Sequence, residues 1–118
     1  MAVQTKQQAG HDAASCARAD DALVRAFGLL GRRWMGIVLG TLSSGPAGFR
    51  ELARAIDGIS DSMLSTRLND LTEAGLITRS VDDGPPVSVA YALTDAGHAL
   101  IPALSEITNW AKSHLPSD

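Results

Sequence analysis

The chain has 118 residues, 45% of them apolar and 19% charged, so we expect one globular domain with a modest core. No run of about 18 apolar residues is present to span a membrane, and residues 1–15 lack the apolar segment of a secretion signal, so a cytoplasmic location is expected. The single cysteine, Cys16, excludes an internal disulfide, and the net charge of −3 counts against a DNA-binding protein, because non-specific affinity for DNA comes from neutralised phosphates.

Two regions are expected along the chain. Residues 1–15 are rich in Gln, Ala and Gly without periodicity, which predicts a disordered N-terminal arm. Residues 16–118 are expected to form the folded domain. Its first half predicts three helices, over residues 20–30, 32–42 and 49–56, with Asp20 or Asp21 capping the first and a turn at 43–46 before the third.

The stretch from Gly58 to Gly75 predicts a fourth helix. Leu64, Leu68 and Leu71 recur at helical spacing and should face the core. Ser60 is placed to cap the first turn, and Gly75 is placed to end the helix. The opposite face carries short uncharged polar side chains: Ser62, Ser65, Thr66 and Asn69. Such a face suits close approach to a polar partner, of which the DNA major groove is the leading candidate, although a plain amphipathic helix has the same pattern.

A β-hairpin and a last helix are predicted after this helix. Residues 76–81 and 87–93 alternate as strands do, and the segment Asp82–Pro86 between them has turn chemistry. Thr94 is placed to cap a helix that runs to about His114. Two helices around a glycine-containing turn, followed by a hairpin, predict a winged helix-turn-helix: a mainly α fold with a small antiparallel β-hairpin, of α+β type.

The last helix has an apolar stripe, and it follows a winged helix-turn-helix that is already complete, so another surface is needed to cover the stripe. The stripe comprises Leu100, Leu104, Ile107, Trp110 and Ala111. We expect a homodimer formed through the first and last helices. The alternative is that the last helix folds back on the core of its own chain.

The basic residues are concentrated around the predicted helix-turn-helix. Residues 32–79 hold six arginines and five acids, a local balance of +1 against −3 for the whole chain. Arginine suits phosphate and guanine because its planar fork donates two hydrogen bonds at once. Duplex DNA is therefore the expected partner, while a winged helix used only for protein–protein contact remains the alternative from another class.

Four segments resemble the HxlR-type winged helix-turn-helix transcriptional regulators of bacteria. They are LLGRRW (29–34), GPAGFRELARAIDGISDSMLSTRLNDLTEAGLI (45–77), PVSVAYALTDAG (86–97) and NWA (109–111). The resemblance as a whole covers about residues 20–115, in order and without large gaps. The resemblance implies a dimeric DNA-binding regulator, often a repressor, that recognises a pseudo-palindromic operator. It also implies, for several members, control by quinones, aldehydes or thiol oxidants through a cysteine near the N-terminus.

The resemblance also implies roles for individual residues. Ser60 falls at the helix cap, and Arg67 falls at an arginine of the recognition helix; because Arg67 lies near the leucine face, it is expected to contact phosphate. Base edges are expected to be contacted directly or through water by Ser62, Ser65, Thr66 and Asn69. Further phosphate contacts are expected from Arg50 and Arg79, and less strongly from Arg32 and Arg33. The alternative is that these arginines are solvated or paired with Glu51, Asp57 or Asp70. The acidic Asp82-Asp83 tip predicts a wing that adds little affinity.

Cys16 is the candidate redox-sensing residue. It precedes the first helix, where the positive end of the helix dipole favours thiolate, and Arg18 adds positive charge while Asp20 and Asp21 oppose it. Oxidation would give a Cys16–Cys16 disulfide between subunits or a mixed disulfide with a small thiol. Many redox-sensing relatives have this cysteine about one helical turn later, so a buried structural cysteine at the dimer contact is the alternative.

No catalytic set or metal site is predicted. The three histidines are far apart in sequence and lack ligand spacing with Cys16, and no cofactor is implied. The remaining alternative within DNA binding is a regulator released by a small ligand between the dimer helices, lined by Phe27, Trp34 and Trp110.

Overall fold

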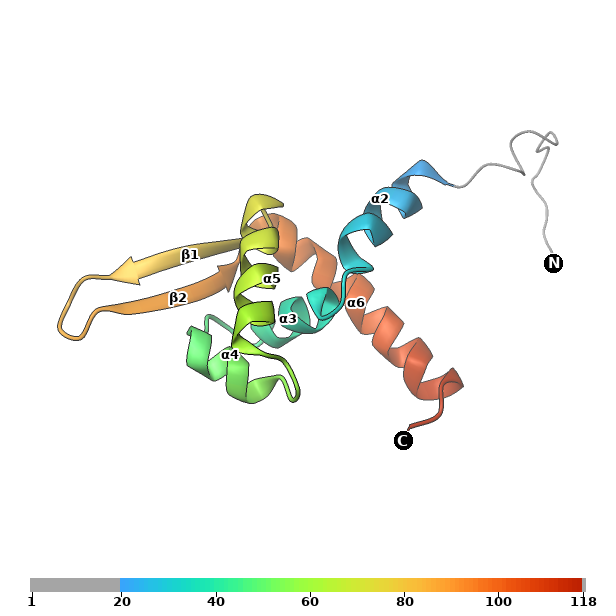
Figure 1. Ribbon diagram of the computed structural model, residues 1–118. Helices are drawn as coiled ribbons and strands as arrows, with labels where there is room; N and C mark the ends of the chain where they lie inside the picture. Colours follow the sequence, from blue (N-terminus) through green and yellow to red (C-terminus); the bar gives the residue numbers. More distant parts are fainter. Residues whose placement is uncertain (1–19, 118) are drawn as a thin grey trace, which may run out of the picture. The chain divides into compact units, whose positions relative to one another are not determined.

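The computed structural model describes residues 20–117, which contain five helices and one two-stranded hairpin in the order α2, α3, α4, α5, β1, β2, α6 (Figure 1). The chain divides into two compact units, whose boundary lies between Arg32 and Arg33. The N-terminal unit contains α2, and the second unit, called here the winged unit, contains residues 33–117. The predicted arm and Cys16 lie outside the described residues, so the predicted boundary of the domain at residue 16 stays a prediction.

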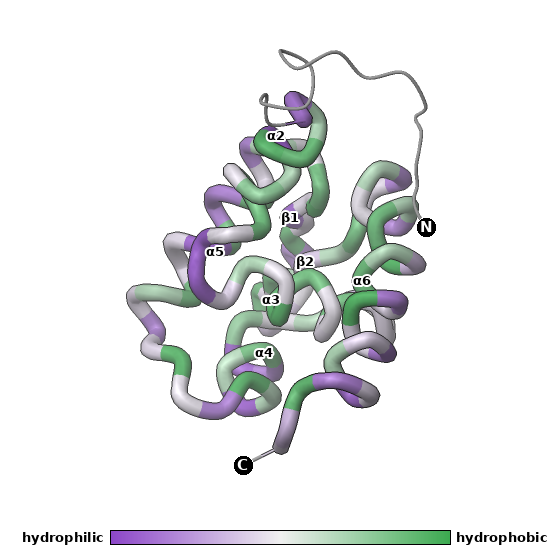
Figure 2. Tube along the Cα trace, turned by 90° about the vertical axis from the view of Figure 1, so that its right-hand side faces the viewer, coloured by the Kyte–Doolittle hydropathy of each residue, from purple (hydrophilic) through white to green (hydrophobic). Residues whose placement is uncertain are grey.

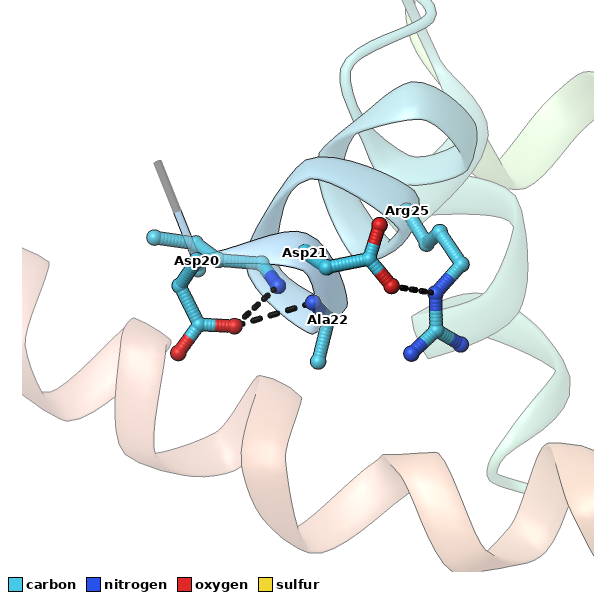
Figure 3. Close-up of polar contacts among 5 residues, drawn as sticks. Asp20, Asp21, Ala22 and Arg25 are labelled. Carbon is cyan, nitrogen blue, oxygen red and sulfur yellow. Dashed lines mark hydrogen bonds and ion pairs between the residues drawn. The ribbon is translucent and has the colours of Figure 1, made fainter. Parts of the chain in front are cut away.

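Helix α2 spans Asp21–Leu30 and begins as predicted. The Asp20 carboxylate accepts hydrogen bonds from the N–H groups of Ala22 and Leu23 at 2.9 and 3.2 Å, and Asp21 pairs with Arg25 one turn later at 2.9 Å (Figure 3). No residue of α2 is buried, although much of the helix is hydrophobic (Figure 2). Phe27, for example, is 54% exposed. A helix of this kind lacks the apolar cover that normally stabilises an amphipathic face.

The winged unit contains four helices: α3 (Met35–Leu42), α4 (Phe49–Ala55), α5 (Asp61–Glu73) and α6 (Asp95–His114). The buried apolar residues come from the first three of these helices, the turn after α4 and the first strand, and are Met35, Val38, Leu39, Leu42, Leu52, Ile56, Leu64, Leu68, Leu71 and Ile77. The three leucines predicted to line the inner face of the fourth helix are therefore confirmed. Within residues 20–117, no buried polar or charged side chain interrupts this core.

The hairpin consists of β1 (Ile77–Asp82) and β2 (Ser88–Leu93), paired antiparallel from Ile77 with Leu93 to Asp82 with Ser88. It extends away from the helices of the winged unit (Figure 1). Ala47, in the loop before α4, exchanges two backbone hydrogen bonds with Tyr91, at 3.0 and 2.8 Å. This bridge attaches the base of the wing to the start of the helix-turn-helix, and the predicted winged helix-turn-helix fold is confirmed.

The joint between α5, the wing and α6 is tightly packed around Thr94 and Gly97. The Thr94 hydroxyl donates to the Gly75 carbonyl at 2.7 Å and accepts from the Gly97 N–H at 3.2 Å, so the predicted cap is confirmed. The Thr94 N–H donates to the Leu76 carbonyl at 3.0 Å. Gly75 has φ +78, a left-handed conformation that glycine adopts without steric cost.

Helix α3 begins later than predicted, at Met35 rather than Arg32. The reason is Trp34, whose φ of 77° and ψ of −11° place it in the left-handed region, where it is the single non-glycine residue with positive φ among residues 20–117. For a residue with a side chain this conformation costs about 1–2 kcal/mol, so surrounding contacts must maintain it.

None of the helices described in residues 20–117 is long and apolar enough to cross a membrane.

Candidate nucleic-acid interface

Helix α4 and the turn after it fix the start of the candidate recognition helix. The Gly48 N–H donates to the Glu51 carboxylate at 2.8 Å, which satisfies a free donor at the start of α4. After α4 the chain reverses through Gly58, whose φ of +88° suits glycine. The Ser60 hydroxyl then accepts from the Met63 N–H at 3.0 Å, so Ser60 caps α5 as predicted.

The outward face of α5 carries the predicted polar residues. Three buried leucines hold the opposite side of the helix against the core. The exposed side chains on the outward face are Ser62, Ser65, Thr66 and Asn69. The helix thus presents hydroxyl and amide groups from successive turns on one side, and this is a surface that can hydrogen-bond to base edges.

The hydroxyl of Thr66 is already used as a donor. It donates to the Ser62 carbonyl at 3.0 Å, one turn earlier in the same helix. Its lone pairs remain able to accept, and its methyl group remains able to make apolar contacts. Towards DNA, Thr66 is therefore suited to an exocyclic amino group of adenine or cytosine or to the thymine methyl group.

The arginines around this face differ in their surroundings. Arg50 on α4 pairs with Asp61 in the first turn of α5 at 2.7 Å, and both side chains are mostly exposed. Arg79 is exposed on β1 opposite Tyr91. Arg54 is also exposed, one turn after Arg50 on α4, and was not among the predicted site residues. The i, i+4 spacing of Arg50 and Arg54 places both on one face of a helix, and this spacing could have added Arg54 to the predicted site.

Arg67 is turned towards the protein. Its Nε donates to the Arg33 carbonyl at 2.8 Å, and its Nη1 lies 2.6 Å from an oxygen of the Asp70 carboxylate. The side chain is only 15% exposed. These described contacts are internal to the winged unit, and the phosphate contact expected from the sequence stays a prediction. Arg33, expected to be a weaker phosphate contact, lies with its guanidinium 4.8 Å from the centre of the Trp34 ring.

The remaining sequence predictions for sites concern metal and redox chemistry. Among residues 20–117, His, Cys, Asp and Glu side chains form no group of three that could hold a metal ion. Cys16 is outside the described residues, so its surroundings remain a matter of prediction.

The polar face of α5, the capped turn that orients it and the adjoining hairpin together define a winged helix-turn-helix protein of the DNA-binding class.

Comparison with known proteins places the chain within that class. Residues 29–118 match the HxlR-like helix-turn-helix family, and the chain belongs to this family. Over 86 residues it is 41% identical to the HTH-type transcriptional regulator YodB of Bacillus subtilis, and the match covers 73% of this chain and 77% of that protein. The protein is therefore a transcriptional regulator with a helix-turn-helix.

Solved structures agree with the sequence comparison. The reduced form of YodB from B. subtilis matches with a TM-score of 0.74 and 36% identity, covering 86% of this chain and all of that one (100%). The quinone-bound form of YodB matches with a TM-score of 0.69 and 35% identity, covering 80% and 99%. The redox regulator HypR in its oxidised form matches with a TM-score of 0.76 and 27% identity, covering 81% and 99%. The fold is thus shared with regulators whose structures are known in reduced, oxidised or quinone-bound forms.

Proposed function

We propose that the protein is a homodimeric repressor that binds a pseudo-palindromic operator with α5 of each subunit in the major groove. The observation that carries this proposal is the uncharged polar face of α5, exposed over successive turns while the leucines behind it are buried. A helix-turn-helix places its second helix in the groove, and short side chains let that helix approach the base edges closely.

The proposed contacts divide into two kinds. Asn69 is the residue suited to bidentate hydrogen bonding with adenine, and Ser62, Ser65 and Thr66 add shorter contacts, directly or through water. Arg50 on α4 and Arg79 on β1 bind phosphates, and Ser60 lies at the α5 N-terminus, where free N–H groups also favour phosphate. Arg67 belongs to the proposed interface as part of α5, but its described contacts with Arg33 and Asp70 are directed into the protein.

The dimer is supported by exposed apolar side chains in both units. In the N-terminal unit, Leu23, Val24 and Phe27 are each more than half exposed on α2. In the winged unit, Trp110 of α6 is 54% exposed, and Ile107 nearby is also exposed. Apolar surface of this kind on two helices is typical of an interface between subunits. Two recognition helices bind one face of DNA when they are about 34 Å apart.

Oxidation of Cys16 is the proposed signal for release. The structures of YodB in reduced and quinone-bound forms and of HypR in an oxidised form support control by quinones or thiol oxidants in this family. In this chain, two Cys16 thiols would lose two protons and two electrons to an oxidant such as diamide and form a disulfide between subunits. A link at this position would alter the spacing of the two recognition helices. The alternative signal is a small ligand bound between the dimer helices.

A gel-shift titration with the DNA upstream of the protein's own gene tests the proposal. Affinity should fall steeply as salt rises, because bound phosphates release counterions. Diamide or a quinone should lower the affinity of the wild type but not of Cys16→Ser. Equal responses of the two proteins would exclude Cys16 as the switch. Binding without salt dependence, or no binding, would favour a winged helix that contacts only proteins.

A further inference from the structure

The junction between the two units is an unusual piece of main chain. Arg33 is the first residue of the winged unit, and Trp34 directly after it has the left-handed backbone that side chains disfavour. Helix α3 begins at Met35, and the Trp34 carbonyl accepts its first-turn hydrogen bond from the Val38 N–H at 2.9 Å. The start of α3 therefore depends on Trp34 keeping this conformation.

Contacts from the helix-turn-helix hold this junction. The Arg67 Nε of α5 donates to the Arg33 carbonyl, which belongs to the peptide group that precedes Trp34. The Trp34 ring lies beside the turn between α4 and α5, since a Cβ at Gly58 would be 3.6 Å from the ring carbon Cη2. The strained residue is thus held between the recognition helix and the turn that precedes that helix.

The Arg67 side chain is itself fixed by an acid on its own helix. Asp70 accepts from Arg67 Nη1 at 2.6 Å, and both side chains are at most 20% exposed. A guanidinium donates from Nε and Nη1 along fixed directions, so it can bridge a carbonyl and a carboxylate at once. A lysine ammonium is a single point charge at the end of a flexible stem and does not reproduce this bridge.

We infer that Arg67 is a positioning residue, which ties the recognition helix to the backbone through which the N-terminal unit is attached. The same bond then maintains the left-handed Trp34 and transmits changes at the attachment of α2 to α5. This inference deepens the proposed function, because it gives the chain between α2 and α3 a defined route to the DNA-binding helix. A single hydrogen bond, donated by Arg67 Nε to the Arg33 carbonyl, makes this connection.

The experiment compares Arg67→Lys with Arg54→Lys, the same change at an exposed arginine on α4. Amide hydrogen exchange of the full chain, read by mass spectrometry, should accelerate about tenfold over residues 32–38 in Arg67→Lys. Exchange in the hairpin should stay unchanged, and Arg54→Lys should match the wild type everywhere. Unchanged exchange over residues 32–38, or equal acceleration in all helices, would overturn the inference.

A DNA measurement separates positioning from phosphate contact. The double variant Arg67→Gln/Asp70→Asn removes both charges without leaving a lone carboxylate. Positioning predicts weaker binding with an unchanged slope of log affinity against log salt. A slope shallower by about 0.9, the value for one lost phosphate contact, together with normal exchange, would overturn the inference. If the wild type binds no DNA, the proposed function fails, while the exchange experiment still decides the role of Arg67.

Discussion

Replacing Gly97 by alanine should destabilise the protein although it adds only one methyl group. Gly97 is buried in the first turn of α6. A Cβ there would clash with the Leu76 carbonyl oxygen and would lie 3.1 Å from Leu93 Cδ2. The carbonyl cannot retreat freely, because it also accepts the Thr94 N–H at 3.0 Å. The added methyl group must therefore push apart the joint between α5, the wing and α6.

Two opposing effects set the magnitude. Overpacking of a buried site costs about 1–3 kcal/mol, and a clash with backbone belongs at the upper end. Alanine regains up to about 1 kcal/mol over glycine through its helix propensity. The free energy of unfolding should therefore fall by about 2 kcal/mol. For a domain of this size, that lowers the melting temperature by roughly 8–16 °C.

Urea and thermal unfolding followed by circular dichroism, at one protein concentration, measure this change. Gly40→Ala in α3 is the matched control, because the Cβ it would add meets nothing within 4 Å apart from its chain neighbours and the nearby backbone of its own helix. That variant should be as stable as the wild type or more stable by up to about 1 kcal/mol. If Gly97→Ala is no less stable than Gly40→Ala, the packing at this joint is not as tight as inferred.

Three further substitutions test the helix-turn-helix. Asp61→Asn should raise DNA affinity a few-fold in gel shifts, because it releases Arg50 and removes a repulsive charge; lower affinity would mean that the ion pair orients Arg50 for binding. Asn69→Ala should cost about 1–3 kcal/mol on the preferred operator and relax one base position in selection from randomised DNA, whereas uniform loss across sequences would argue against base reading. Ser60→Ala should lower the free energy of unfolding by about 1 kcal/mol in urea, and an unchanged midpoint would show that the Met63 N–H finds another partner.

Much of the winged unit was predictable because its signals are local. Helix α5 spans Asp61–Glu73 between its predicted cap and Gly75, since leucine spacing, a serine cap and a glycine stop all act within one segment. Alternating residues around a turn gave the hairpin within one residue at each strand start. The start of α3 was wrong because Trp34 has no local signal for a left-handed backbone. The residues that lie beside this segment, Arg67 at the Arg33 carbonyl and Gly58 near the Trp34 ring, are far along the chain.

Helical periodicity also predicted the exposed polar face of α5, but it did not predict the contacts that the nearby arginines make. The contact between Arg67 and Asp70 has i, i+3 spacing, yet that spacing alone does not show that Arg67 also reaches the Arg33 carbonyl. The Arg50–Asp61 pair joins two helices across a turn, so it requires the three-dimensional fold. The count of six arginines against five acids therefore overstates the positive charge that is free to meet phosphate. In the proposed DNA complex, selectivity would come mainly from the uncharged side chains of α5, and the salt dependence should correspond to few phosphate contacts per subunit.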